Sequence, residues 1–142
     1  ERGRRRTALS EWSEGGMKYL FATDGSKTSQ KAFAVLLKLV TKEDEVILLN
    51  VSDGQGSSGA QGRAALSDCE TDLRLEMVSS VSLQREGPAR TVICETASKE
   101  EVDIVVMGSH GMGLLSKKYT KLGSVAHYVA THTKAATLIV KP

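Results

Sequence analysis

The sequence has few of the residues on which several common protein classes depend. Among 142 residues, two are cysteine, two are proline and 4% are aromatic. The cysteines, Cys69 and Cys94, are not closely spaced and have no histidine cluster near them, which argues against a disulfide-rich scaffold and a zinc site. We therefore expect two reduced cysteines that pack in the fold, no bound metal, and a cytoplasmic location.

The sequence also lacks a large excess of charge of one sign and long apolar runs. Nineteen Lys and Arg against seventeen Asp and Glu leave a net charge of +2, a small excess for a dedicated nucleic-acid-binding protein. The low aromatic content argues against stacking platforms for single-stranded nucleic acid. No run approaches the roughly 18 consecutive apolar residues that cross a membrane. These absences predict a protein that binds neither nucleic acid nor a membrane.

The first sixteen residues differ in composition from the rest. They are polar, lack periodicity and end in Gly15 and Gly16, and their arginine run is not followed by the apolar core of a secretory signal. We expect residues 1–16 to form a flexible N-terminal extension and residues 17–142 to form the folded domain. A basic arm that contacts phosphates or a partner is the alternative interpretation of the extension.

Short apolar runs alternate with amphipathic stretches from residue 17 onward. Four runs show little internal alternation, which is typical of strands covered on both faces of a parallel sheet, and they lie at residues 19–22, 46–51, 102–107 and 137–140. Residues 77–84 alternate apolar and polar side chains, which predicts a less covered strand near an edge of the sheet.

Helical periodicity occupies most of the sequence between these strands. Helices are predicted at residues 26–41 with Ser26 as the N-cap, at 63–75, after Pro88, and at 124–131. Residues 52–62 are rich in Gly and Ser, which predicts a flexible surface connection. The alternating order predicts an α/β fold, with an open, doubly wound, mainly parallel five-stranded sheet and helices on both faces.

Small and polar residues follow three of the predicted strands. They form the sequences Thr23-Asp24-Gly25-Ser26, Ser52-Asp53-Gly54 and the glycine-rich stretch at 108–113. Ligands of doubly wound sheets bind beyond the carboxyl ends of the strands, where glycines let backbone N–H groups approach an anion. Gly123 and Ser124 offer a second anion site at a helix start. Asp24 could hold a ribose hydroxyl or an amino group, and the alternative is that these residues only form turns and begin helices.

Five segments of the sequence carry a resemblance to a known family. They are KYLFATDGS at 18–26, VILLNVSD at 46–53, EEVDIVVMGSHGMG at 100–113, GSVAHYV at 123–129 and ATLIVKP at 136–142. Through them the chain resembles the universal stress protein family over nearly all of residues 17–142. The resemblance implies the adenine nucleotide α-hydrolase-like fold. The family's nucleotide-binding form carries Gly-x2-Gly-x9-Gly-Ser/Thr, whereas eleven residues separate Gly111 from Gly123 here, a departure that bears on the phosphate loop more than on the fold.

The resemblance also implies a site for ATP or AMP, with Mg²⁺ as an optional companion. The implied residues are Ala22, Thr23 and Asp24 for the adenosine, Val51 for the adenine, Met107 and Gly108 for the ribose, and Gly111, Gly123, Ser124 and Val125 for the phosphates. His110 either donates to a phosphate or only fills the turn. Lys117, Lys118 and Lys121 either reach phosphate oxygens or lie in a solvated loop.

The sequence shows no obvious nucleophile–base pair and no cluster of carboxylates, so we do not expect an enzyme. Slow ATP hydrolysis is left open, because phosphoryl transfer needs mainly positioning and charge. The leading hypothesis is an adenine-nucleotide-binding stress-response or regulatory protein. The alternative is a non-nucleotide-binding interaction or signalling module with the same fold, which the departure in glycine spacing favours.

The last predicted strand also suggests an assembly. Residues 137–140 are short and apolar, and at a sheet edge their unpaired backbone groups would attract another chain. The resemblance adds that such strands commonly pair antiparallel across a two-fold axis, the commonest symmetry of small oligomers. We therefore expect a homodimer with Leu138 and Val140 near the contact.

Overall fold

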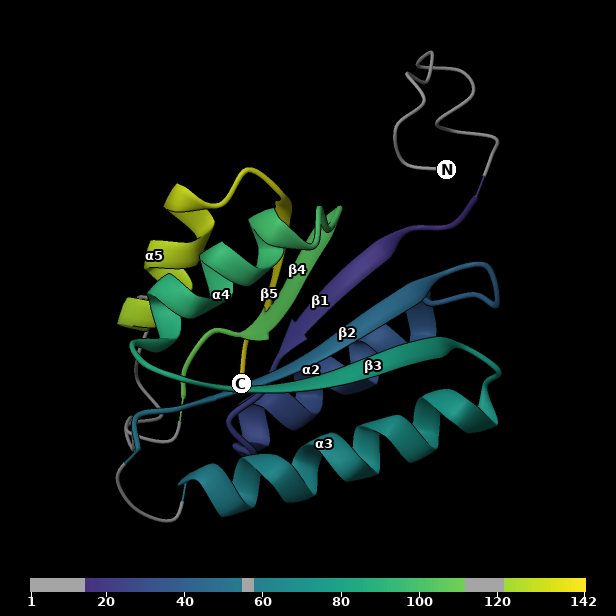
Figure 1. Cartoon of the computed structure of the whole chain (residues 1–142), viewed down its shortest axis with the longest axis horizontal. Helices are drawn as coiled ribbons and strands as arrows, with labels where there is room; N and C mark the ends of the chain where they lie inside the picture. Colours follow the sequence, from purple (N-terminus) through teal and green to yellow (C-terminus); the bar gives the residue numbers. More distant parts are fainter. Residues whose placement is uncertain (1–14, 55–57, 112–121) are drawn as a thin grey trace.

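The computed structural model describes residues 15–54, 58–111 and 122–142 (Figure 1). Most of the predicted N-terminal extension therefore lies outside the described residues. Lys117, Lys118 and Lys121 also lie outside the described residues. Whether they reach phosphate oxygens or lie in a solvated loop therefore stays a prediction.

Five parallel strands form one sheet in the order β3-β2-β1-β4-β5. The strands are β1 (Lys18–Ala22), β2 (Glu45–Ser52), β3 (Ser79–Glu86), β4 (Ile104–Gly108) and β5 (Ala136–Val140). The helices that alternate with them are α2 (Lys27–Leu39), α3 (Ser58–Leu75), α4 (Ala89–Lys99) and α5 (Ser124–His132). The predicted α/β fold, with its parallel five-stranded sheet, is confirmed, and β3 lies at an edge as predicted.

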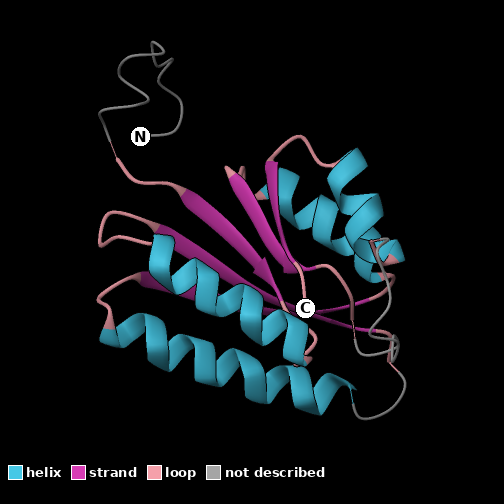
Figure 2. Ribbon diagram, turned by 180° about the vertical axis from the view of Figure 1, so that it is seen from behind, coloured by secondary structure: helices cyan, strands magenta, loops and turns pink. Residues whose placement is uncertain are grey.

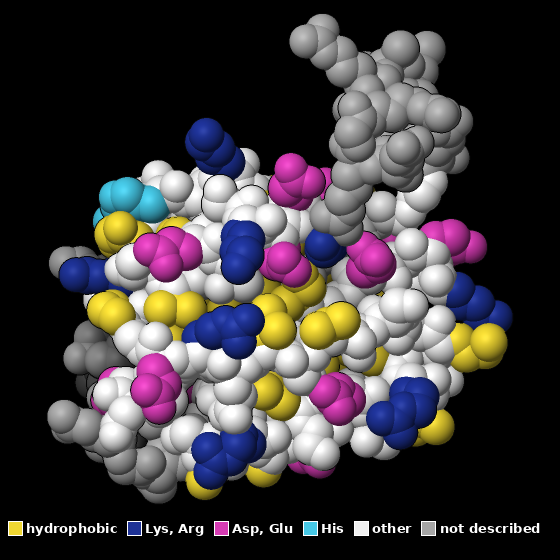
Figure 3. Space-filling model, viewed as in Figure 1, with side chains coloured by type: hydrophobic (Ala, Val, Ile, Leu, Met, Phe, Trp, Pro, Cys, Tyr) yellow, Lys and Arg dark blue, Asp and Glu magenta, His cyan; other side chains and the backbone are white. Residues whose placement is uncertain are grey.

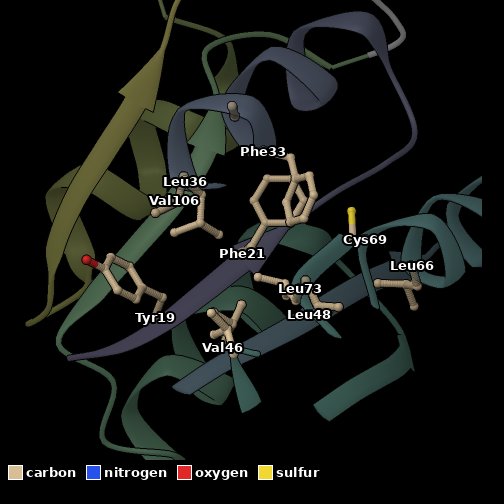
Figure 4. Packing of buried hydrophobic residues seen from close by; sticks show 12 residues of the cluster. Tyr19, Phe21, Phe33, Leu36, Val46, Leu48, Leu66, Cys69, Leu73 and Val106 are labelled. Carbon is tan, nitrogen blue, oxygen red and sulfur yellow. The ribbon is translucent and has the colours of Figure 1, made fainter. Parts of the chain in front are cut away.

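Helices α2 and α3 cover one face of the sheet, and α4 and α5 cover the other (Figures 1 and 2). Neighbouring residues of β1 and β2 point to opposite faces, so each strand supplies both apolar layers. Phe21 and Leu48 belong to the α2/α3 layer, where the Phe21 and Phe33 rings lie 5.2 Å apart (Figure 4). Leu20 and Leu49 belong to the α4/α5 layer. This two-sided burial explains why the strand sequences are apolar without alternation.

The order of the strands determines where a ligand site can form. The chain runs outward from β1 through β2 to β3, and then returns to the other side of β1 with β4. The connections after β1 and β4 therefore leave the sheet in opposite directions, which opens a crevice at the carboxyl ends of these two strands. The two turns that the sequence singled out, at residues 23–26 and 108–111, lie at this switch point.

The start of α3 differs from the prediction. The helix begins at Ser58 rather than at residue 63, so the predicted flexible connection over 52–62 is wrong for its second part. Glycine is a poor helix former, which is why this segment looked like a loop. A Cβ atom at Gly62 would overlap the amide of Asn50 on β2, so the glycine is required by close helix–sheet packing.

Other boundaries differ by a few residues. The side chain of Ser26 accepts a hydrogen bond from the Ser29 N–H at 3.2 Å, so Ser26 is the N-cap of α2 as predicted. Met77 has a φ of 60° and lies in the left-handed turn after α3, so β3 begins at Ser79 and not at 77. Such a turn is not visible in an apolar–polar pattern, because a methionine rarely adopts this conformation.

The surface mixes charges of both signs over the face seen in Figure 3, where basic and acidic side chains alternate across the helices. None of the helices in the described part of the chain is long and apolar enough to cross a membrane.

Candidate functional site

A cavity of about 710 Å³ lies at the carboxyl ends of β1, β2 and β4. Its volume falls in the usual range of small-molecule sites, roughly 300–1,000 Å³. All eleven residues predicted for a ligand site line it, namely Ala22, Thr23, Asp24, Val51, Met107, Gly108, His110, Gly111, Gly123, Ser124 and Val125. Segments that are far apart in the sequence therefore meet at one cavity.

The wall of the cavity divides into two kinds of surface. Apolar side chains come from the strands and from α4, namely Ala22, Leu49, Val51, Ala89, Ile93 and Met107. Hydroxyls and exposed backbone come from the turns after β1 and β4 and from the start of α5. Among the described residues that line the cavity there is no lysine or arginine, and Asp24 is the one carboxylate. Such a cavity suits a ligand with a flat apolar part and a small polar or anionic part.

Hydrogen bonds hold the turn after β1 in one conformation. The Thr23 N–H donates to the Leu49 carbonyl at 2.9 Å, and the Thr23 hydroxyl accepts from the Gly25 N–H at 3.1 Å. The same hydroxyl donates to the Ser29 hydroxyl at 3.0 Å. The turn is therefore tied both to the neighbouring strand β2 and to the first turn of α2.

Asp24 takes part in this turn and also reaches the turn after β4. Its Oδ1 accepts a hydrogen bond from the Ser26 N–H at 2.9 Å, so the carboxylate helps to begin α2. A Cβ atom at Gly111 would lie 2.7 Å from the other oxygen, Oδ2. Glycine at 111 therefore lets the turn after β4 approach the carboxylate. The two interpretations of Asp24, a ligand contact and a helix start, do not exclude each other.

The turn after β4 is hydrogen-bonded to the last strand and to the start of α5. Ser109 is buried, its N–H donates to the Val140 carbonyl at 2.9 Å, and its carbonyl accepts from the Gly123 N–H at 2.8 Å. The last of these bonds brings Gly123 to the turn that contains Gly111. The eleven residues between the two glycines therefore do not keep them from lining the same cavity. The Ser109 hydroxyl lies 2.8 Å from His110 Nδ1.

The first residues of α5, Ser124, Val125 and Ala126, line the cavity. Gly123 is the N-cap residue and has no side chain to accept from the backbone N–H groups at this helix start. The first N–H groups of a helix have no partner within the helix, and the helix dipole favours negative charge there. This end of the cavity is thus suited to an anion.

The cysteines and the remaining histidines do not line the cavity. Burial, with smaller contributions from Asp72 and Asp68, raises the pKa of Cys69 to about 12, and burial also raises the pKa of Cys94. Both thiols are therefore protonated at neutral pH. Within the described residues, no group of three or more His, Cys, Asp or Glu side chains is arranged to hold a metal ion. With Asp24 as the one carboxylate of the described wall, a Mg²⁺ here would be held mainly by ligand oxygens and water.

Several residues of the wall were not predicted from the sequence. They are Ser26, Ser29, Leu49, Ala89, Ile93, Ser109, Leu122 and Ala126. Ile93 and Leu49 fit the apolar pattern of a helix and a strand, and that pattern does not distinguish a core residue from a cavity wall. Ser26 and Ser109 had a sequence signal, because both lie inside strand-end turns that the sequence singled out, at residues 23–26 and 108–113.

Comparison with known proteins agrees with this architecture. The sequence matches the universal stress protein family over residues 17–141. The chain is 26% identical, over 109 residues and 69% of each chain, to universal stress protein Sll1654 of Synechocystis sp. strain PCC 6803. The solved structure of protein MJ0577 is 27% identical and superposes with a TM-score of 0.78, covering 89% of this chain and 96% of that one.

Two further structures share the fold and hold adenine nucleotides. A universal stress protein in complex with cAMP has a TM-score of 0.70 at 22% identity, covering 90% of this chain and 98% of that one. A family member from Arabidopsis thaliana with AMP bound has a TM-score of 0.66 at 17% identity, covering 89% and 92%. The family match spans nearly all of the described fold, and the chain belongs to the universal stress protein family.

Proposed function

We propose that this protein binds an adenine nucleotide, ATP or AMP, as a stress-response or regulatory protein. One observation carries the proposal: two strand-end turns and an open helix N-terminus meet at a single cavity that also has an apolar wall. An adenine ring needs apolar surface, and a phosphate needs N–H groups and hydroxyls. The nucleotides held by two structures of the same fold support the choice of adenine.

The residues take the following roles in this proposal. Val51 and its apolar neighbours flank the adenine. Ala22, Thr23 and Asp24 contact the adenosine, and Met107 and Gly108 line the ribose. Gly111, Gly123, Ser124 and Val125 receive the phosphates through N–H groups and the Ser124 hydroxyl, and His110 donates to a phosphate.

We also propose binding rather than rapid turnover. Transfer of a phosphoryl group depends on cations that stabilise the transferring oxygens. The described wall contains no lysine or arginine and has a single carboxylate. Backbone groups and a helix dipole can hold a nucleotide, but they stabilise the transition state of phosphoryl transfer only a little. Such a site suits a protein that responds to nucleotide binding more than one that hydrolyses the nucleotide. The predicted cytoplasmic location stays a prediction.

Calorimetry of the purified chain with AMP and with ATP, with and without Mg²⁺, tests the nucleotide proposal. Asp24→Asn keeps an oxygen that can accept from the Ser26 N–H and removes the charge, whereas Asp24→Ala removes both. The matched control is Asp68→Asn, a change at an exposed carboxylate of α3 away from the cavity. We expect heat of binding for the unmodified chain and the control, and weaker binding for both Asp24 variants. No heat at millimolar AMP or ATP would overturn the proposal and favour the interaction module.

The proposed homodimer forms through β5. This strand is at the edge of the sheet, and Leu138, Ile139 and Val140 are each partly exposed. Sedimentation equilibrium at micromolar concentration is the test, and a mass near the 15.2 kDa of one chain would contradict the dimer. Ile139→Pro removes a backbone donor of β5 and should weaken the dimer. Circular dichroism of the same variant checks that the fold is retained.

A further inference from the structure

Asn50 is a buried amide directly behind the candidate site. It lies on β2 between Leu49 and Val51, which both line the cavity, but its own side chain points to the other face of the sheet, toward Gly62 of α3. Asn50 is 1% exposed. A buried amide lowers stability unless its donors and acceptors are paired, so its presence calls for a physical reason.

The Asn50 amide is paired at both ends. Its Nδ2 donates to the Thr23 carbonyl at 2.9 Å, and its Oδ1 accepts from Gln84 Nε2 at 3.1 Å. The first bond reaches the end of β1, and the second reaches the edge strand β3. Asn50 therefore joins three strands at the level where the cavity begins.

Helix α3 closes over this amide. Gly62 lies against it so closely that any side chain at 62 would overlap it. The preceding residue of α3, Gln61, contacts the turn after β1, because its Nε2 donates a hydrogen bond to the Gly25 carbonyl at 3.4 Å. Helix α3 thus covers the Asn50 amide, and its orientation follows from its partners, since the Thr23 carbonyl needs a donor and Gln84 Nε2 needs an acceptor.

Thr23 connects Asn50 with the ligand-facing residues. Its N–H is held by Leu49 and its carbonyl by Asn50, so both sides of the residue are fixed by β2. The next residue is Asp24, whose carboxylate faces the cavity. A change in the direction of the Thr23 carbonyl rotates the peptide that leads into Asp24, and it moves the carboxylate relative to the turn after β4.

We propose that Asn50 is a positioning residue of the nucleotide site, which acts through Thr23 from the opposite face of the sheet. It touches no ligand, and it sets the affinity by fixing the turn that carries Asp24. The inference rests on the proposed nucleotide function and adds to it a residue outside the cavity wall. A purely structural role would predict a loss of stability in proportion to any loss of affinity.

Asn50→Asp is the variant that separates the two roles. The carboxylate has almost the shape of the amide and can still accept from Gln84, but when ionised it cannot donate to the Thr23 carbonyl and repels it. When protonated, it carries one O–H donor and restores the bond. Burial raises the pKa of a carboxyl group, so protonation falls within an accessible pH range.

The measurement is the AMP affinity of the variant relative to that of the unmodified chain at each pH. We expect Asn50→Asp to bind AMP about tenfold more weakly near pH 8, and the ratio to approach one near pH 5. Taking the ratio at each pH removes the titrations that both measurements share, such as that of the phosphate. An affinity ratio of one at the higher pH, or a ratio that does not recover with acid, would overturn the proposal.

Val46→Ala is the matched control. Val46 lies on the same strand and the same face as Asn50, is 1% exposed, and is at the end of β2 remote from the cavity. It should lower the melting temperature and leave the AMP affinity within about twofold of the unmodified chain at both pH values. If Val46→Ala weakens AMP binding as much as Asn50→Asp at equal loss of stability, the effect is general and the positioning role is wrong.

Amide hydrogen exchange keeps the test independent of the nucleotide. In the unliganded chain near pH 8, we expect Asn50→Asp to speed exchange at Gly25 and Ser26 about tenfold relative to the unmodified chain, and Val46→Ala to leave it unchanged. Unaltered exchange at these two amides would overturn the positioning role. If the unmodified chain binds no AMP but exchange responds as expected, the proposed function fails while Asn50 still positions the turn.

Discussion

The two faces of the sheet are built from the same strands but are used differently. On the α2/α3 face, large side chains such as Phe21, Phe33 and Leu36 fill the space between helix and sheet. On the α4/α5 face, small residues such as Ala22, Ala89 and Ala126 stand at the carboxyl ends of the strands, where the cavity lies. The comparison teaches that side-chain volume, and not the pattern of apolar residues, separates a filled core from a candidate binding site here.

The largest effect on stability is expected when a large side chain is removed from the α2/α3 face. Phe33→Ala removes a 7% exposed ring that packs on Phe21. We expect it to lower the free energy of unfolding by about 3–5 kcal/mol, measured by urea denaturation. Val81→Ala at an exposed position is the control and should change the stability by no more than about 0.5 kcal/mol. A loss near 1 kcal/mol for Phe33→Ala would mean that this face is loosely packed.

On the α4/α5 face, we expect ligand binding to be sensitive to a larger side chain in the cavity wall. Ala89→Trp places a large ring at the first residue of α4, where the wild-type methyl group borders the cavity. We expect AMP binding to weaken about a hundredfold, or ~2.7 kcal/mol, because the adenine space is occupied. The free energy of unfolding should change by less than about 1 kcal/mol, because the ring enters an existing space. Ala34→Trp, on the exposed side of α2, is the control that should leave binding intact.

A smaller effect separates the part of the cavity proposed for the phosphate from the part proposed for the adenine. Ser124→Ala removes one hydroxyl at the start of α5 and leaves the backbone N–H groups in place. We expect AMP to bind about tenfold more weakly, ~1.4 kcal/mol, since a hydrogen bond to a charged group is lost. Adenosine lacks the phosphate and should bind both proteins equally in calorimetry. An equal loss for AMP and adenosine would place Ser124 away from the phosphate.

On the α2/α3 face we also expect a change in how the free energy of unfolding depends on pH. Burial raises the pKa of Cys69 from 9.0 to about 12, so between these values the unfolded chain releases a proton that the folded chain keeps. Its contribution to stability is complete below pH 9 and is lost as the pH rises toward 12. Urea midpoints measured across this window should fall less steeply for Cys69→Ala than for the unmodified chain. Cys94→Ala, at a half-buried thiol, should change the slope less, and identical slopes in all three proteins would contradict the assignment.

Much of the fold was predictable because it depends on local patterns. Apolar runs without alternation predicted four strands, and the structure confirms these strands with four interleaved helices. Strands β1, β2 and β4 are largely buried, whereas β5 is partly exposed at the edge of the sheet. The start of α3 was not predictable in this way. Gly59 and Gly62 are poor helix formers, and the reason for Gly62 is a contact with Asn50 twelve residues earlier in the chain, which a local pattern does not contain.

Some residues of the candidate site were likewise predictable from the sequence, and others were not. The residues at strand ends were predictable, because a parallel sheet always brings its carboxyl ends together, and all eleven line the cavity. Ala89, Ile93 and Ser29 were not, since a helix residue that faces a cavity has the same sequence signature as one that faces the core. Their place in the wall depends on the length and angle of the helices.

By itself, the sequence determined the alternating order of strands and helices and the polar turns after β1 and β4, because backbone preferences and hydrophobic periodicity act over a few residues. The tertiary structure alone decided that Gly111 and Gly123 meet despite the eleven residues between them, through the bond from Gly123 to the Ser109 carbonyl. It also decided that Asn50 reaches Thr23 from behind the site. Both contacts join segments whose separation along the chain says nothing about their distance in space, and only the packing of helices on the sheet sets that distance.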